Sequence, residues 1–225
     1  MARVDLKRRA EIGEAKRART RAAILQAASA CYATPMGAPV TVETVTQAAG
    51  LAKGTFYTHF QDLAALEAEL GATLIAELDE GLQPARLAAD HPLTRTATAV
   101  TVMLRNLAAA PSRARLAARA VVTMPEVGQA VQVRLRQDLA DAQAADLLAF
   151  KSVDLAAGVV LALCERAARE IAAGRIGASA VQDIVRAVLR ALGCTPDEAA
   201  LRADEAAHHA DLFANGRPRI AARVP

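Results

Sequence analysis

The sequence contains no tryptophan, few other aromatic residues and only three cysteines, which are widely spaced. Aromatic residues make up 3% of the 225 positions. Cys31, Cys164 and Cys194 form no CxxC pair, so neither a disulfide framework nor a metal ribbon is indicated. A reducing cytoplasm is the simplest setting for such a chain, and no metal or cofactor is expected.

Long hydrophobic runs are missing as well. The longest apolar run, from Leu155 to Cys164, is ten residues, whereas a membrane-spanning helix needs about 20. The N-terminus begins with charged residues and lacks the apolar core of a secretory signal. We therefore expect a cytoplasmic protein with no membrane partner.

Motifs typical of enzymes are also missing. The sequence has no GxSxG elbow, P-loop or HExxH motif, and no paired carboxylates in a recognisable catalytic context. His208 and His209 are adjacent, but they lie in a polar segment where a solvated tail is the better interpretation than a metal site. No catalytic residue is therefore proposed, and an enzyme is not indicated.

The residues that are abundant favour helix. Hydrophobic residues make up 53% of the chain, largely as alanine, and they are mixed with Leu, Arg and Glu. No stretch shows the sustained alternation of a strand. The composition predicts an all-α protein, and the length allows one large or two small domains.

Positive charge is concentrated at the N-terminal end. The net charge of the whole chain is +3, but residues 1–60 hold nine Lys and Arg against four Asp and Glu, an excess of five positive charges. A basic end suits a phosphate-binding module, because each neutralised phosphate releases counterions. A solvated basic tail without a partner is the alternative interpretation of the charge alone.

Residues 41–60, TVETVTQAAGLAKGTFYTHF, have the layout of a helix-turn-helix. Thr41 can cap the first helix through its hydroxyl, and Gly50 suits the left-handed residue that ends it. Leu51 can fill the corner between the two helices. The second helix, beginning near Lys53, has many hydroxyl, aromatic and basic side chains. Much of its surface is therefore expected to be exposed and not buried in the core.

These residues resemble the tetracycline-repressor (TetR) family of bacterial regulators. The resemblance covers about residues 17–66 and is carried by matching positions in register: Arg21, Ile24, Leu25, Ala27, Ala28, Tyr32, Thr41, Val42, Val45, Ala49, Gly50, Leu51, Gly54, Thr55, Tyr57, His59, Phe60 and Leu66. The chain departs from the family at Ala52, where a capping Ser is usual, and at Leu63, where a phosphate-binding Lys is frequent.

The resemblance implies a DNA-binding domain over residues 1–61 and a helical ligand-binding and dimerisation domain over residues 62–225. The first helix is expected from about Lys16 to Ala33, and residues 1 to about 16 are expected to form a flexible basic arm or an N-terminal extension of that helix. Phe56 and Phe60 are expected in the core of the first domain because residues four apart share a helix face. The residues expected to contact operator DNA are Arg17, Arg19, Arg21, Thr41, Lys53, Gly54, Thr55, Tyr57, Thr58 and His59.

Local signals predict the helices that follow. We expect Asp62 to cap a long helix that Pro84 ends, and His91-Pro92 and Thr195-Pro196 to begin two others. Ser112 and the segment Met124-Pro125-Glu126 predict further helix starts. Ser179 and Gln182 have capping-box spacing. Beyond about residue 195 a polar segment leads to an irregular, mobile C-terminus.

By resemblance, residues 152–173 and 179–192 form a homodimer interface. The apolar stripe of the second range recurs at helical spacing through Val181, Val185, Val188 and Leu192. The alternative is that the apolar residues of both ranges are ordinary core within one subunit.

The resemblance also implies a cavity for an unidentified small-molecule effector. Met103, Leu107, Met124 and Phe150 are candidates for its apolar lining, with Arg105, Asn106 or Glu165 as possible polar anchors. An aliphatic or small acidic effector fits the scarcity of aromatic residues. The predicted function is a ligand-responsive regulator of transcription, most simply a repressor released from a palindromic operator. The alternative is a helical architectural or interaction protein that binds DNA non-specifically through its basic end.

Overall fold

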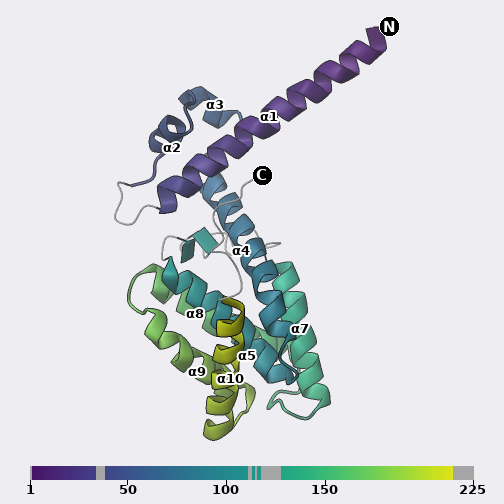
Figure 1. The fold of residues 1–225 in the computed structure, drawn as a ribbon, viewed down its shortest axis with the longest axis vertical. Helices are drawn as coiled ribbons and strands as arrows, with labels where there is room; N and C mark the ends of the chain where they lie inside the picture. The colour runs from purple at the N-terminus through teal and green to yellow at the C-terminus, as the bar shows by residue number, and fades with distance from the viewer. Residues whose placement is uncertain (1, 34–38, 111–112, 115, 118–127, 215–225) are drawn as a thin grey trace. The chain divides into compact units, whose positions relative to one another are not determined.

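The computed structural model describes residues 2–33, 39–110, 113–114, 116–117 and 128–214 (Figure 1). Within these ranges the chain is helical and has no strand, so the expected all-α class is confirmed. It divides into two compact units, residues 1–70 and residues 71–220, and the division falls inside helix α4 (Leu63–Leu87). The first turns of α4 belong to the N-terminal unit because Leu66 is buried in its core.

The N-terminal unit consists of α1 (Ala2–Ala33), α2 (Val42–Ala48), α3 (Lys53–Tyr57) and the beginning of α4. Helix α2 packs on α1, and α3 packs on α2. The core that holds them together is small and apolar, and it is formed by Ile24, Ala28, Val45, Phe56, Phe60 and Leu66. Asp62 caps α4 as expected, because its Oδ1 accepts from the backbone N–H of Ala65 at 2.8 Å.

The basic N-terminal segment is an extension of the first helix, one of the two alternatives expected from the sequence, and not a flexible arm. Helix α1 begins at Ala2, well before the expected start near Lys16, and it projects as one rod (Figure 1). Residues 2–15 contain no proline and mostly good helix formers, so nothing in the segment stops the helix. Gly13 alone opposes it, at a cost of roughly 1 kcal/mol relative to alanine.

The C-terminal unit is built around α5 (Pro92–Ala109), which packs against the other helices of the unit. These are α7 (Gln129–Ala144), α8 (Val153–Ala172), α9 (Val181–Leu192) and α10 (Pro196–Ala214). The expected starts at His91-Pro92 and Thr195-Pro196 are confirmed, with the Thr195 hydroxyl accepting from the N–H of Glu198 at 3.3 Å. The helix starts expected at Ser112 and at Met124–Glu126, and the tail from Asn215, lie outside the described residues.

Pro84 does not end α4, contrary to expectation, because the helix continues to Leu87. A proline inside a helix lacks one donor and crowds the carbonyl four residues earlier. The turn that surrounds Pro84 is anchored by burial: Leu82, Ala85 and Arg86 are all at most 7% exposed. Tertiary packing therefore stabilises a helical turn that local sequence disfavours.

The expected capping box at Ser179 and Gln182 is also wrong. A 3-10 turn, η1 (Ala178–Ala180), precedes α9, and the N-cap position is Ala180, which makes no side-chain cap. Gln182 instead donates to the carbonyl of Ala203 on α10 at 3.3 Å. Val181, which is 1% exposed, sets where the helix begins by entering the core.

Candidate functional sites

The helix-turn-helix is closed by backbone and side-chain hydrogen bonds. Thr41 and Thr44 form a reciprocal capping box at the start of α2, since the Thr41 hydroxyl accepts from the N–H of Thr44 at 3.2 Å and the Thr44 hydroxyl from the N–H of Thr41 at 2.9 Å. Gly50 takes the left-handed conformation, with φ +66, and the N–H of Leu51 donates to the Thr46 carbonyl at 2.9 Å. The capping role of Thr41 and the turn at Gly50 are confirmed.

Helix α3 is anchored by aromatic residues and presents a polar surface. Phe56 is fully buried and Phe60 is 3% exposed, as expected, with ring centroids 5.6 Å apart. Tyr57, by contrast, is 53% exposed. Its ring and the ring of Phe56 are packed edge-to-face, with centroids 5.4 Å apart. The buried phenylalanines therefore fix which side of this short helix faces outward.

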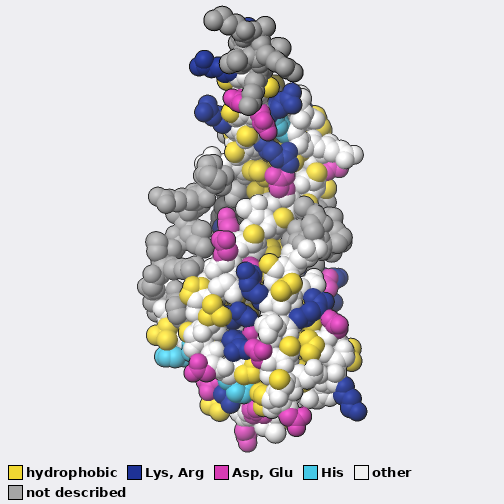
Figure 2. Space-filling view, turned by 90° about the vertical axis from the view of Figure 1, so that its right-hand side faces the viewer, with side chains coloured by type: hydrophobic (Ala, Val, Ile, Leu, Met, Phe, Trp, Pro, Cys, Tyr) yellow, Lys and Arg dark blue, Asp and Glu magenta, His cyan; other side chains and the backbone are white. Residues whose placement is uncertain are grey.

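We call the outward surface of this segment the DNA face, after the DNA contacts that the sequence predicts for its residues. Lys53, Gly54, Tyr57 and Thr58 are exposed on it, whereas Thr55 and His59 are half-buried. No acidic residue occurs between Thr44 and Gln61. The structure brings these candidates together on one short segment. Figure 2 shows Lys and Arg side chains, with Asp and Glu among them, over the end of the molecule that contains α1. The DNA face is defined by its residues, Lys53, Gly54, Thr55, Tyr57, Thr58 and His59.

Arg21 has partners within the N-terminal unit that the sequence did not predict. Its guanidinium pairs with Glu69, donates to the His59 carbonyl at 2.6 Å and lies 4.2 Å from the centroid of the Phe60 ring. These contacts tie α1 to α4 and to the segment that follows α3. Arg21 is therefore a positioning residue here, whereas Arg17 and Arg19 are exposed on α1.

The C-terminal unit contains a partly open cavity of about 250 Å³ between α4, α5, α7 and α8. Met103 and Leu107 line it, as expected from the sequence. Phe150 does not line it and packs against the core, and Met124 lies outside the described residues. Most of the lining is apolar, and the apolar part includes Ile75, Leu78, Leu82, Val100, Val131, Leu135, Val160 and Leu161.

Only one of the three polar anchors considered from the sequence reaches this cavity. Glu165 lines it and is paired with Arg169. Arg105 instead pairs with Asp211 at 2.6 Å, and Asn106 donates to the carbonyl of Val102 at 2.8 Å. Neither of these two is among the lining residues.

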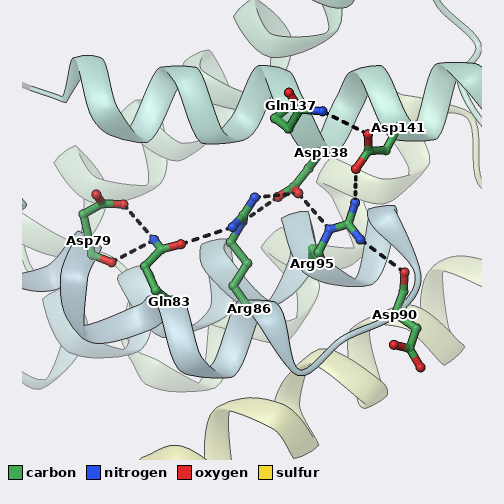
Figure 3. Close-up of polar contacts among 8 residues, drawn as sticks. All are labelled: Asp79, Gln83, Arg86, Asp90, Arg95, Gln137, Asp138 and Asp141. Atoms are coloured by element: carbon green, nitrogen blue, oxygen red, sulfur yellow. Dashed lines mark hydrogen bonds and ion pairs between the residues drawn. The ribbon is translucent and has the colours of Figure 1, made fainter.

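One side of the cavity is formed by a chain of polar side chains from α4 and α7 (Figure 3). Arg86 donates to both carboxylate oxygens of Asp138 at 2.7 Å and to Gln83 at 3.1 Å. Gln83 donates to Asp79 at 3.1 Å, and Asp79 is paired with Arg134. We call these five residues, Asp79, Gln83, Arg86, Arg134 and Asp138, the polar chain.

The polar chain continues beyond the cavity. Arg95 of α5 donates to Asp138 at 2.8 Å and pairs with Asp141 (Figure 3). Arg86 and Asp138 also line a second hollow that opens on this side, so the pair separates it from the cavity. This network was not predicted from the sequence. Polar residues do recur there at i, i+4 and i+7, in both Asp79-Gln83-Arg86 and Arg134-Asp138-Asp141.

The apolar stripe of α9 is core within one subunit, which is the alternative interpretation left open by the sequence. Val181, Val185, Val188 and Leu192 are each at most 1% exposed, so this stripe is not available to a partner chain. Helix α8 differs, because a row of small and apolar residues faces outward from it. We call this row the outer face of α8, and it contains Leu155, Gly158, Val159 and Ala162.

Neither a membrane-spanning helix nor a metal site is found among the described residues. No helix in those ranges is both long and apolar enough to cross a membrane. No group of three or more His, Cys, Asp or Glu side chains in the described part of the chain could hold a metal ion.

Comparison with known proteins identifies the fold. No protein-family model matches the chain, and no curated protein matches its sequence. Among solved structures, RolR in complex with resorcinol is 20% identical with a TM-score of 0.65, and the match covers 92% of this chain and 100% of RolR. TylP, a TetR regulator from Streptomyces fradiae, is 20% identical with a TM-score of 0.55, covering 92% of this chain and 99% of TylP.

The fatty acid degradation regulator FadR from Bacillus halodurans is 16% identical with a TM-score of 0.59, covering 78% of this chain and 97% of FadR. At these identities the likeness concerns the fold. The chain therefore has the helical fold that TylP, RolR and FadR share, and the fold implied by the sequence resemblance is confirmed.

Proposed function

We propose that the protein is a TetR-family regulator of transcription that binds operator DNA and is not an enzyme. The observation that carries this proposal is the DNA face, a polar surface held outward by the burial of Phe56 and Phe60. A recognition helix needs this arrangement, because its base-contacting side chains must be free of the protein's own core. The fold and the sequence motif support the proposal independently. A DNA-binding role places the protein in the cytoplasm.

Each residue of the DNA face has a role that its chemistry suits. Lys53 and Tyr57 contact bases or phosphates, while Gly54 allows the backbone to approach the duplex closely. The hydroxyl of Thr55 and the imidazole of His59 add hydrogen bonds to phosphates, as does the hydroxyl of Thr41 beside the DNA face. The Thr58 hydroxyl donates to the Thr55 carbonyl at 2.7 Å, and it contacts a phosphate by turning away from that carbonyl. Arg17 and Arg19 on α1 extend the contact to neighbouring phosphates, and Arg21 contributes by holding the His59 backbone in place.

Binding to a palindromic operator requires two copies of the chain. One helix-turn-helix contacts a single half-site, and a two-fold dimer places two of them about 34 Å apart, one turn of DNA. We propose a homodimer through residues 152–173 and 179–192. The outer face of α8 supplies its apolar part, since the apolar stripe of α9 is already used within the subunit.

A small-molecule effector that binds in the cavity would release the repressor from DNA. Helix α4 supplies lining residues such as Leu78 and Leu82, and the same helix begins in the N-terminal unit. A ligand that prefers one arrangement of α4 would change operator affinity, with a coupling free energy of about 1–3 kcal/mol. Repression is the simplest outcome of such coupling.

The proposal is tested by selecting bound fragments from the source genome and measuring their affinity by gel shift at fixed salt. We expect the Lys53→Ala and Tyr57→Ala variants each to weaken operator binding about tenfold or more, because a specific contact is worth about 1–3 kcal/mol. Lys151→Ala removes the same charge from an exposed position in the other unit, and we expect it to bind as the wild type does.

Two results would contradict the proposal. Unchanged binding by Lys53→Ala and Tyr57→Ala would show that the DNA face is assigned wrongly. Recovery of fragments with no shared sequence, together with a steep salt dependence, would favour the non-specific architectural protein instead.

A further inference from the structure

One buried hydroxyl in the cavity has no protein partner within the described residues. Thr96 of α5 lines the cavity and is 1% exposed, and its Oγ1 makes no hydrogen bond to the described part of the chain. Oγ1 itself has almost no accessible surface, so a ligand in the cavity reaches it once the Thr96 side chain rotates about its Cα–Cβ bond. The threonines on either side of it are satisfied: Thr94 donates to Glu205 at 2.8 Å, and Thr98 donates to the carbonyl of Thr94 at 2.8 Å. A buried polar group without a partner is unfavourable, so a ligand group that bonds to it gains that free energy on binding.

Charged groups around the cavity are compensated by opposite charges. Arg86 pairs with Asp138, Arg134 with Asp79, and Glu165 with Arg169, so each charged lining residue already has its counterion. Arg86 and Asp138 are, moreover, almost fully buried. A charged ligand would lose its hydration on entering and find no free counterion, which is costly in an apolar cavity.

The remaining lining accepts a compact apolar body. The cavity volume is about 250 Å³, whereas a dry cavity of about 150 Å³ already takes benzene. Cys164 adds a neutral side chain to this wall, because burial raises the pKa of its thiol to about 12. One substituted ring or a short alkyl chain therefore fits the described space.

We infer that the effector is an uncharged, compact apolar molecule that carries a hydroxyl group, and that this hydroxyl bonds to Thr96 Oγ1. The inference rests on the proposed function, since it identifies the chemical class of the effector. It replaces the expectation of a small acidic effector, because every cation that lines the described cavity is already paired with a carboxylate.

Three matched probes distinguish the ligand classes by isothermal titration calorimetry on the full-length protein. They share one benzene ring with a propyl chain: 4-propylphenol is neutral with a hydroxyl, propylbenzene lacks the hydroxyl, and 4-propylbenzoate is an anion. We expect 4-propylphenol to bind about tenfold more tightly than propylbenzene, the difference that one hydrogen bond makes, and 4-propylbenzoate to bind most weakly. A second series of octan-1-ol, octane and octanoate covers flexible ligands.

The hydroxyl contact is tested with Thr96→Val, which keeps the shape of the side chain and removes Oγ1. We expect this variant to bind the hydroxyl probes about tenfold more weakly and to bind propylbenzene unchanged. Thr101→Val is the matched control, because Thr101 is another fully buried α5 threonine whose Oγ1 has no partner in the described residues, but it does not line the cavity. Its affinity for every probe should equal that of the wild type.

Several results would overturn the inference. Tighter binding of either carboxylate, no binding of either alcohol at millimolar concentration, or equal losses in Thr96→Val and Thr101→Val would each contradict it. Gel shifts on the same preparations separate this outcome from the proposed function. Operator binding without probe binding would refute only the ligand class, whereas probe binding without any preferred DNA fragment would refute the regulator.

Discussion

Gly54 shows how a single residue serves the DNA face. It is exposed on α3, and a Cβ added to it would meet no atom of this chain within 4 Å. Packing within the protein therefore does not require a glycine here. A glycine at an exposed helical position, where the protein itself leaves room for a side chain, allows the backbone to approach a binding partner such as DNA more closely.

Replacing Gly54 with alanine separates these two roles. We expect Gly54→Ala to leave the free energy of unfolding unchanged or raise it by about 0.5–1 kcal/mol. Operator affinity should fall about tenfold, since the added methyl group holds the backbone away from the duplex. Gly13→Ala makes the same exchange at an exposed position in α1 where a Cβ also meets nothing, and it should not weaken binding. Unchanged operator affinity in Gly54→Ala would contradict a close approach at this point.

At the scale of elements, a histidine at the start of α5 lies near charged side chains of the facing helix α10. His91 occupies the N-cap position of α5, and burial lowers the pKa of its imidazole. The cation of Arg202 on α10 lowers it further, and other charged neighbours act in both directions. Those neighbours are Glu205 and Glu198, which raise the pKa, and Arg95, which lowers it.

The depressed pKa of His91 predicts that the protein loses stability as the pH falls. In the unfolded chain this imidazole takes up a proton near pH 6.5, whereas in the folded chain it does so only at lower pH. Between these two pKa values the unfolded state binds more protons, so stability is highest above about pH 6.5 and declines below it.

Urea unfolding at about pH 7.5 and about pH 5.5 tests this dependence. We expect His91→Asn, which keeps a residue suited to the N-cap position, to reduce the loss of stability between the two pH values. His208→Asn makes the same exchange at an exposed position on α10 and should retain the wild-type dependence. An equal pH dependence in the wild type and in His91→Asn would contradict the role of this histidine.

At the scale of the whole molecule, the exposed apolar row on α8 distinguishes the two helices that the sequence assigned to the dimer. Leu155 is 57% exposed, whereas the apolar stripe of α9 is internal. Small residues such as Gly158 and Ala162 allow a second helix to approach closely. The outer face of α8 is therefore the surface that we propose for contact with a second copy of the chain.

We expect Leu155→Glu to convert a dimer to a monomer in sedimentation velocity. The new carboxylate would be buried at the proposed interface without a positively charged partner, which is energetically costly. Operator affinity should fall with it, since the two half-sites would no longer be bound by one particle. Val133→Glu introduces the same charge at an exposed apolar residue of α7, 66% exposed, and should remain dimeric. A wild-type protein that sediments as a monomer, or a dimeric Leu155→Glu variant, would contradict the assignment.

The sequence determined the features that depend on local chemistry. The turn at Gly50, the caps at Thr41 and Asp62, and the core positions of Phe56 and Phe60 follow from short-range spacing, because hydrogen bonds within one turn and helical periodicity are encoded by neighbouring residues. The all-α class follows from composition for the same reason.

Tertiary structure decided the features that depend on residues distant in the chain. Pro84 stays inside α4 because burial of its turn offsets the local penalty, and Arg21 turns to Glu69 because the chain brings α1 and α4 together. The polar chain exists because Arg86 meets Asp138, 52 residues away. A helix encodes its own periodicity, but which of its faces meets another helix is set by the packing of the whole unit.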